Sequence, residues 1–98
     1  MSTHPISYQL QLFIADNEPN SLQAKANLEQ ICSRYLSDNF YQLEIIDVLE
    51  NFQLAFQQGI LVTPTLLIKS PLPVKMIVGT LTEVKLVLNA MQIVENQL

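Results

Sequence analysis

The chain has 98 residues, of which 49% are hydrophobic, and carries a formal net charge of −4 with only five Lys and Arg residues. A chain of this length is typical of one domain, and it can bury a modest core without disulfides or metals. The basic residues are scattered, which excludes the clustered cations that nucleic acid or an anionic membrane surface requires. We therefore expect a single domain over residues 1–98 that binds neither.

The cysteine content and the N-terminal sequence indicate the compartment. A single cysteine, Cys32, excludes a disulfide within the chain and any metal site built from several cysteines. The start, MSTHPISYQL, lacks the basic residues and apolar block of a signal peptide, and no apolar run approaches the roughly 20 residues of a membrane-spanning helix. These features favour a reduced, cytoplasmic location. Residues 1–7 are expected to form a flexible tail, which contains His4 without a nearby Cys or His.

Strand and helix patterns alternate in the first half of the chain. Residues 8–14, YQLQLFI, alternate between apolar and polar and predict a strand. Apolar residues then recur at helical spacing over about residues 21–37, with Asn20 as the expected N-cap. Residues 41–48, YQLEIIDV, predict a second strand. The segment 8–48 is therefore expected to form a βαβ unit with parallel strands.

The second half combines short apolar runs with three of the five prolines. Residues 50–58 predict a short helix that ends at Gly59, with Leu54 and Ala55 on its inner side. Residues 65–68 and 74–78 predict strands, and their KSPLP connection is too short for a crossover helix, so we expect an antiparallel hairpin. The tail predicts a helix capped by Thr82. Its apolar residues lie on two sides, however, and their β-branched content also suits a strand.

The resulting order, βαβαββα, is the thioredoxin-like arrangement of an α/β fold. In that fold a proline precedes the third strand, and Thr63-Pro64 fits this position, so we expect a cis bond there. The fold usually carries two redox cysteines at the start of the first helix, where the helix N-terminus lowers the pKa of one thiol. Residues 16–21, DNEPNS, contain no sulfur. Without a CxxC motif, dithiol exchange is excluded.

No other group of residues points to catalysis. Cys32 lies on the apolar side of its helix and is expected to be a small buried hydrophobe. Glu44 and Asp47 lie on opposite faces of their strand, and Asp47 is expected to be a solvated or turn-capping acid. Asp16 and Glu18 are expected to belong to a charged turn, not to a metal site. We therefore expect a binding domain that is not an enzyme and holds no cofactor or metal.

Three segments resemble the KaiB family of the cyanobacterial circadian clock: YQLQLFIADNEPNSLQA, LEIIDVLENFQLAFQQGILVTPTL and PLPVKMIVGTL. The resemblance runs from about residue 8 to residue 91. It implies a non-catalytic protein that binds the N-terminal ring of a KaiC-type ATPase, regulates its phosphorylation cycle and sequesters KaiA there. It also implies two folds. One is the thioredoxin-like form that binds the ring, and the other is a tetrameric or dimeric resting form with a rearranged C-terminal half.

The resemblance also points to individual residues. The prolines and the glycine within residues 60–81 weaken any single strand pairing there. A segment without one strongly preferred pairing can support two packings of similar free energy. The fold-switch candidates are Pro64, Pro71, Pro73, Gly79 and Thr80. The candidates for partner contact are Tyr8, Gln23 and Lys75. The chain departs from the family at Thr80, where Asp is common, and at four positions that are often basic: Gln11, Gln23, Ile68 and Met76.

An alternative function remains open. The chain is also similar to the sensor domain of the clock-associated histidine kinase SasA, so it could be the input domain of such a kinase or a stress-response protein outside the clock. The run QLAFQQGILVTPTLL is closer to KaiB than to that sensor domain, which favours a stand-alone protein.

Overall fold

The computed structural model describes residues 7–36 and 40–93 and has the predicted order of elements. They are β1 (Ser7–Ile14), α1 (Pro19–Tyr35), β2 (Phe40–Asp47), α2 (Phe52–Gln57), β3 (Thr65–Ser70), β4 (Lys75–Val78) and α3 (Val84–Ala90). The strands form one mixed sheet in the order β2-β1-β3-β4. β1 and β2 are parallel, whereas β3 is antiparallel to both β1 and β4. The structure therefore confirms the thioredoxin-like arrangement, and the parallel βαβ unit and the antiparallel hairpin with it.

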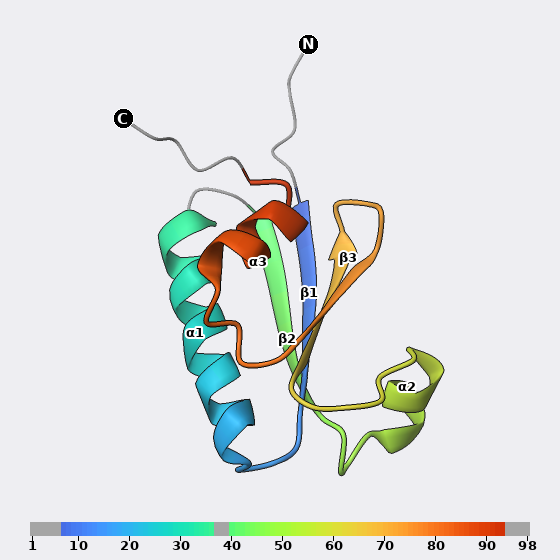
Figure 1. Cartoon of the computed structure of the whole chain (residues 1–98). Helices are drawn as coiled ribbons and strands as arrows, with labels where there is room; N and C mark the ends of the chain where they lie inside the picture. Colours follow the sequence, from blue (N-terminus) through green and yellow to red (C-terminus); the bar gives the residue numbers. More distant parts are fainter. Residues whose placement is uncertain (1–6, 37–39, 94–98) are drawn as a thin grey trace.

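The helices cover the two faces of the sheet unequally. α1 and α3 lie together on one face, and the short α2 lies alone on the other (Figure 1). The alternation in β1 explains this division, because Tyr8, Leu10 and Leu12 belong to the core cluster under α1 and α3. Phe13 points the other way and packs in a smaller cluster with Ala55 of α2. Only one end of the second face is thus covered.

The start of α1 differs from the prediction. The helix begins at Pro19 with Glu18 as its N-cap, so the expectation of Asn20 as the cap is wrong. Proline is favoured at the first helical position because its fixed φ suits the helix and its missing N–H has no partner there anyway. Ser7, which the sequence placed in the tail, begins β1. The rest of that expected tail, including His4, lies outside the described residues.

The predicted C-terminal helix is short, because α3 covers only Val84–Ala90, and residues 94–98 lie outside the described residues. α3 begins after Glu83, so the prediction that Thr82 caps the helix is wrong. Val87, Leu88 and Met91 are buried in the main core, whereas Leu86 is 53% exposed. The two-sided apolar pattern therefore resolves into one face that packs on the sheet and one leucine that does not.

Candidate functional site

The start of α1, where a thioredoxin-like enzyme would hold its cysteines, carries a set of oxygen-centred hydrogen bonds. Ser21 Oγ donates to Glu18 Oε1 at 2.8 Å, and Thr63 Oγ1 donates to the same oxygen at 3.3 Å. The Ser21 side chain is buried, and its Oγ accepts the N–H of Ala15 at 3.1 Å. These bonds connect α1 with the end of β1 and with the segment before β3. Because the bonds join three segments of the chain, we expect them to stabilise this end of the sheet.

Replacing Ser21 with alanine is expected to lower the free energy of unfolding by about 1–3 kcal/mol, because the Ala15 N–H loses its acceptor and Glu18 loses a donor. Urea denaturation measures this change. Asn17→Ala, at an exposed neighbouring position, is the control and should change the value by less than about 0.5 kcal/mol. Equal midpoints for the two variants would contradict a structural role for the cluster.

Cys32 is a core residue, as the sequence predicts. Its side chain is 1% exposed within the main core cluster. Burial, with a smaller contribution from the charge of Glu29, raises the pKa of the thiol to about 11. Since the thiolate is the reactive form, the folded protein keeps Cys32 protonated and inert at neutral pH.

The raised pKa of Cys32 predicts a loss of stability at alkaline pH. Between pH of about 9 and about 11 the unfolded chain releases the thiol proton while the folded chain retains it, so the free energy of unfolding falls as the pH rises. The loss is at most about 2–3 kcal/mol by pH 11. Urea titrations across this pH range measure the free energy of unfolding, and Cys32→Ala should show a shallower decline. If the variant has the same pH dependence as wild type, the thiol of Cys32 is not the cause of the decline.

The fold-switch candidates lie at the two ends of the hairpin, and the structure brings two of them together. The peptide bonds before Pro64, Pro71 and Pro73 are all cis, which confirms the prediction for Thr63-Pro64. The N–H of Gly79 donates to the carbonyl oxygen of Pro64 at 3.0 Å, beyond the end of the β3–β4 ladder. Gly79 has φ of +119°, a conformation that glycine adopts readily.

The junction between β4 and α3 is held by a long-range hydrogen bond and contains backbone strain. Asn27 Nδ2 donates to the carbonyl oxygen of Thr80 at 2.8 Å, which ties the junction to α1. The next residue, Leu81, has φ of +63°, although its side chain is buried in the main core. A left-handed conformation of a residue with a branched apolar side chain costs roughly 1–2 kcal/mol. Burial of Leu81 therefore offsets a local cost in this fold.

The three partner-contact candidates do not form one surface. Tyr8 is 3% exposed and belongs to the core under α1 and α3. Burial also raises the pKa of its hydroxyl. Gln23 is exposed on α1, and Lys75 is half-buried on β4. In this fold, a partner can reach Gln23 and Lys75 but not the side chain of Tyr8.

An extensive exposed apolar surface surrounds α2, and none of the sequence-based site candidates belongs to it. Phe52 and Phe56 lie four residues apart in α2, so they share one side of the helix, and they are 70% and 80% exposed. Ala55 packs against the sheet instead. The flanking loops contribute further exposed apolar side chains. We call the set the α2 surface: Leu49, Phe52, Phe56, Leu61 and Val62. The prediction that Leu54 and Ala55 face inward already implied that the two phenylalanines face outward.

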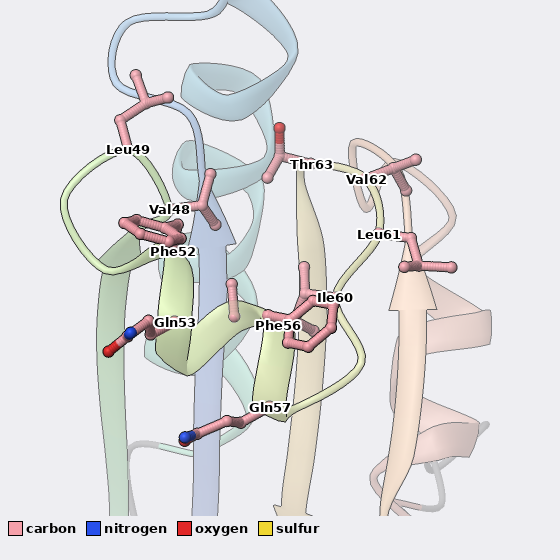
Figure 2. Close-up of a pocket in the computed structure, with 11 residues that line it drawn as sticks. Val48, Leu49, Phe52, Gln53, Phe56, Gln57, Ile60, Leu61, Val62 and Thr63 are labelled. Atoms are coloured by element: carbon pink, nitrogen blue, oxygen red, sulfur yellow. The ribbon is translucent and has the colours of Figure 1, made fainter.

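The α2 surface borders a shallow groove with a volume of 880 Å³. Figure 2 shows the residues that line it: Phe52 and Phe56 project from α2, and Leu61 and Val62 come from the segment that leads to β3. Thr63, Gln53 and Gln57 supply the polar groups of the lining. Exposed apolar patches on small proteins commonly mark interaction sites. The arrangement is therefore that of a binding surface for a larger molecule.

The acidic residues near this surface have structural partners or face solvent. Asp47 Oδ1 accepts the N–H groups of Leu49 at 3.0 Å and of Asp16 at 3.3 Å, which confirms the prediction of a turn-capping acid. Glu44 accepts a hydrogen bond from Gln11 at 3.0 Å. Among residues 7–36 and 40–93, no cluster of three His, Cys, Asp or Glu side chains could hold a metal ion. In the same ranges, no helix has both the length and the apolar character needed to cross a membrane.

Solved structures with the same arrangement include the N-terminal domain of SasA and thioredoxins. The N-terminal domain of SasA from Synechococcus elongatus superposes with a TM-score of 0.72, covers 100% of this chain and 93% of its own, and is 22% identical. Chloroplastic thioredoxin z superposes with a TM-score of 0.70, covers 94% of this chain and 96% of its own, and is 19% identical. At these identities the likeness establishes the thioredoxin-like fold alone.

The sequence profile described as the KaiB domain matches residues 11–93. The chain belongs to the KaiB family. "Circadian clock protein KaiB3" of Synechocystis is 44% identical over 85 residues, which cover 87% of this chain and 82% of the relative. "Circadian clock oscillator protein KaiB" of Gloeothece citriformis is 38% identical over 98 residues, which cover 100% of this chain and 92% of the relative. These KaiB relatives support a role as a clock component and confirm the family that the sequence segments indicated.

Proposed function

We propose that this KaiB-family protein is a non-catalytic clock component that binds a KaiC-type ATPase ring and regulates its phosphorylation cycle, with KaiA as a further partner. The exposed α2 surface is the observation that carries this proposal. Its five large side chains are between 51% and 89% exposed, and water contact with so much apolar surface is unfavourable until a partner covers it. Two of them, Phe52 and Phe56, are aromatic, a class of residue that is enriched in the cores of protein interfaces.

Binding through this surface would depend on the fold. The α2 surface comes from two parts of the chain. One part contains α2 and the residues before it, with Leu49, Phe52 and Phe56. The other is the segment that enters β3, with Leu61 and Val62. A rearranged C-terminal half would separate these two parts of the surface. A ring that binds the complete α2 surface therefore stabilises the thioredoxin-like form by mass action, which couples association to the choice of fold.

The second half of the proposal is reversible switching to a tetrameric or dimeric resting form. The fold-switch residues remain Pro64, Pro71, Pro73, Gly79 and Thr80. The left-handed backbone of Leu81, next to Thr80, supports a role for this junction, because strain there reduces the preference for the thioredoxin-like form. Gln23 and Lys75 are proposed as secondary contacts outside the α2 surface, and Tyr8 is not, since its side chain is buried.

A sensor-domain function is the weaker alternative. The SasA domain shares the fold at 22% identity, whereas the KaiB relatives share 38–44%. A stress-response role outside the clock would use the same surface with another partner.

Size-exclusion chromatography with light scattering tests the proposal, first on the protein alone and then with the host's KaiC-type ATPase and nucleotide. We expect a complex with one copy of this chain per ATPase subunit. A free oligomer that dissociates as the complex forms would support the resting form. The absence of co-elution with any KaiC-type ATPase of the host would overturn the proposal in favour of the sensor or stress-response alternatives.

A further inference from the structure

The α2 surface is bordered by four acidic residues. Two of them, Asp16 and Asp47, are joined by the hydrogen bond from the Asp16 N–H to Asp47 Oδ1. Glu18 accepts a hydrogen bond from Thr63, which lines the groove. Glu50 follows Leu49 of the α2 surface directly in the chain. We call these four residues the acidic rim: Asp16, Glu18, Asp47 and Glu50.

The rim forms because the two parallel strands end at the same edge of the sheet. Ile14 pairs with Asp47, so the loops that follow β1 and β2 begin side by side. Asp16 and Glu18 belong to the first loop, while Glu50 belongs to the second. Asp16, Glu18 and Glu50 are exposed, and their charges can therefore act on an approaching molecule.

The basic residues of the chain lie elsewhere. Lys25 and Arg34 belong to α1, and Lys85 belongs to α3, the two helices on the opposite face of the sheet. Lys69 and Lys75 lie at the end of the β3–β4 ladder that is farther from the acidic rim. At that end, Ile68 of β3 pairs with Lys75 on one side and with Leu10 of β1 on the other. Four of the nine acidic residues of the chain therefore border the α2 surface, whereas no Lys or Arg lines its groove.

We propose that the α2 surface takes a protein segment whose apolar side chains fill the groove and whose flanking residues are Lys or Arg. This inference rests on the proposed function and specifies the chemistry of the partner's contact. Charge complementarity carries it: a rim of one sign attracts an opposite charge on approach and repels a like one. A nucleic acid, an anionic membrane or the same rim of a second copy would bring negative charge to this rim.

The first test is the association rate constant with the host's KaiC-type ATPase at low and high salt. The variant carries Asp16→Asn and Glu50→Gln, which remove two exposed rim charges. Asparagine is chosen because Asp16 has φ of +45°, a conformation that Asn tolerates. Glu18 and Asp47 are left intact because their carboxylates hold the loops together. The control carries Glu29→Gln and Glu83→Gln, an equal change in net charge at exposed positions in α1 and before α3.

We expect the rim variant to associate about tenfold more slowly at low salt and to lose most of the salt dependence, while the control behaves as wild type. Equal rates for the two variants, or wild-type association that accelerates with salt, would overturn the inference. If Phe52→Ala with Phe56→Ala abolishes binding while the rim variant has no effect, the proposed function stands and the basic partner does not.

The second test needs no ATPase, so it decides the inference even if the proposed function fails. Two designed amphipathic helical peptides share the same leucine anchors and differ in having either Lys or Glu beside them. In an NMR titration, the shifts of the amide signals of residues 49–63 report binding of each peptide. We expect the Lys peptide to have a dissociation constant at least about tenfold lower than that of the Glu peptide, and we expect this difference to be smaller for the rim variant. Similar binding of both peptides, or binding of neither, would overturn the inference.

Discussion

Replacing Phe52 and Phe56 together with alanine is expected to weaken binding to the KaiC-type ATPase by about 100-fold or more. Truncating a hot-spot residue at the centre of an interface costs about 2 kcal/mol or more, and we expect both phenylalanines to be such residues. Both rings are mostly exposed in the free protein, so their loss should leave the free energy of unfolding nearly unchanged. Calorimetric or interferometric titration measures the affinity, and urea denaturation verifies that the variant is folded.

The matched control is Leu22→Ala combined with Leu86→Ala. These two leucines are 49% and 53% exposed, and they lie on α1 and α3, across the sheet from α2. Truncating them also removes exposed apolar area, but it leaves the α2 surface untouched. An equal loss of affinity in the control, or undiminished binding by the phenylalanine variant, would place the interface elsewhere on the molecule.

Replacing Leu88 with alanine is expected to destabilise the thioredoxin-like form by about 2–5 kcal/mol. Leu88 is 2% exposed and holds α3 against the sheet and α1, so its truncation leaves a cavity in the main core. If a resting fold lies only a few kcal/mol away, the variant should populate that fold or an oligomer before it unfolds. Light scattering measures the mass of any oligomer. NMR spectra together with urea denaturation measure the populations of the thioredoxin-like form, the resting fold and the unfolded chain.

Leu86→Ala provides the control on the same helix. Leu86 is two residues away but 53% exposed, so its removal should change the free energy of unfolding by less than about 0.5 kcal/mol. A simple two-state unfolding of Leu88→Ala at lower urea, without a new folded species, would argue against a second fold of comparable free energy. Undiminished stability would contradict the role of α3 in the core.

The strands were predictable because their patterns are local. The alternation of residues 8–14 already assigned Tyr8, Leu10 and Leu12 to one face, and the structure places them in one core cluster. The start of α1 was misplaced, because Asn20 has the side chain of an N-cap but Pro19 already fits the first helical position. Local preference could not choose between these two signals. Glu18 accepts one local hydrogen bond, from Ser21, and one from Thr63, which is 45 residues away and which local preference could not indicate.

The sequence by itself determined the order of the elements, the absence of redox cysteines and the KaiB family, since each is written in periodicity, composition or short segments. Only the tertiary structure decided where a partner could bind. It buried Tyr8 under two helices and left Phe52 and Phe56 exposed, although all three are aromatic residues within predicted elements. The reason is physical: a side chain's exposure depends on how completely neighbouring elements cover it, and α2 is too short to cover its face of the sheet.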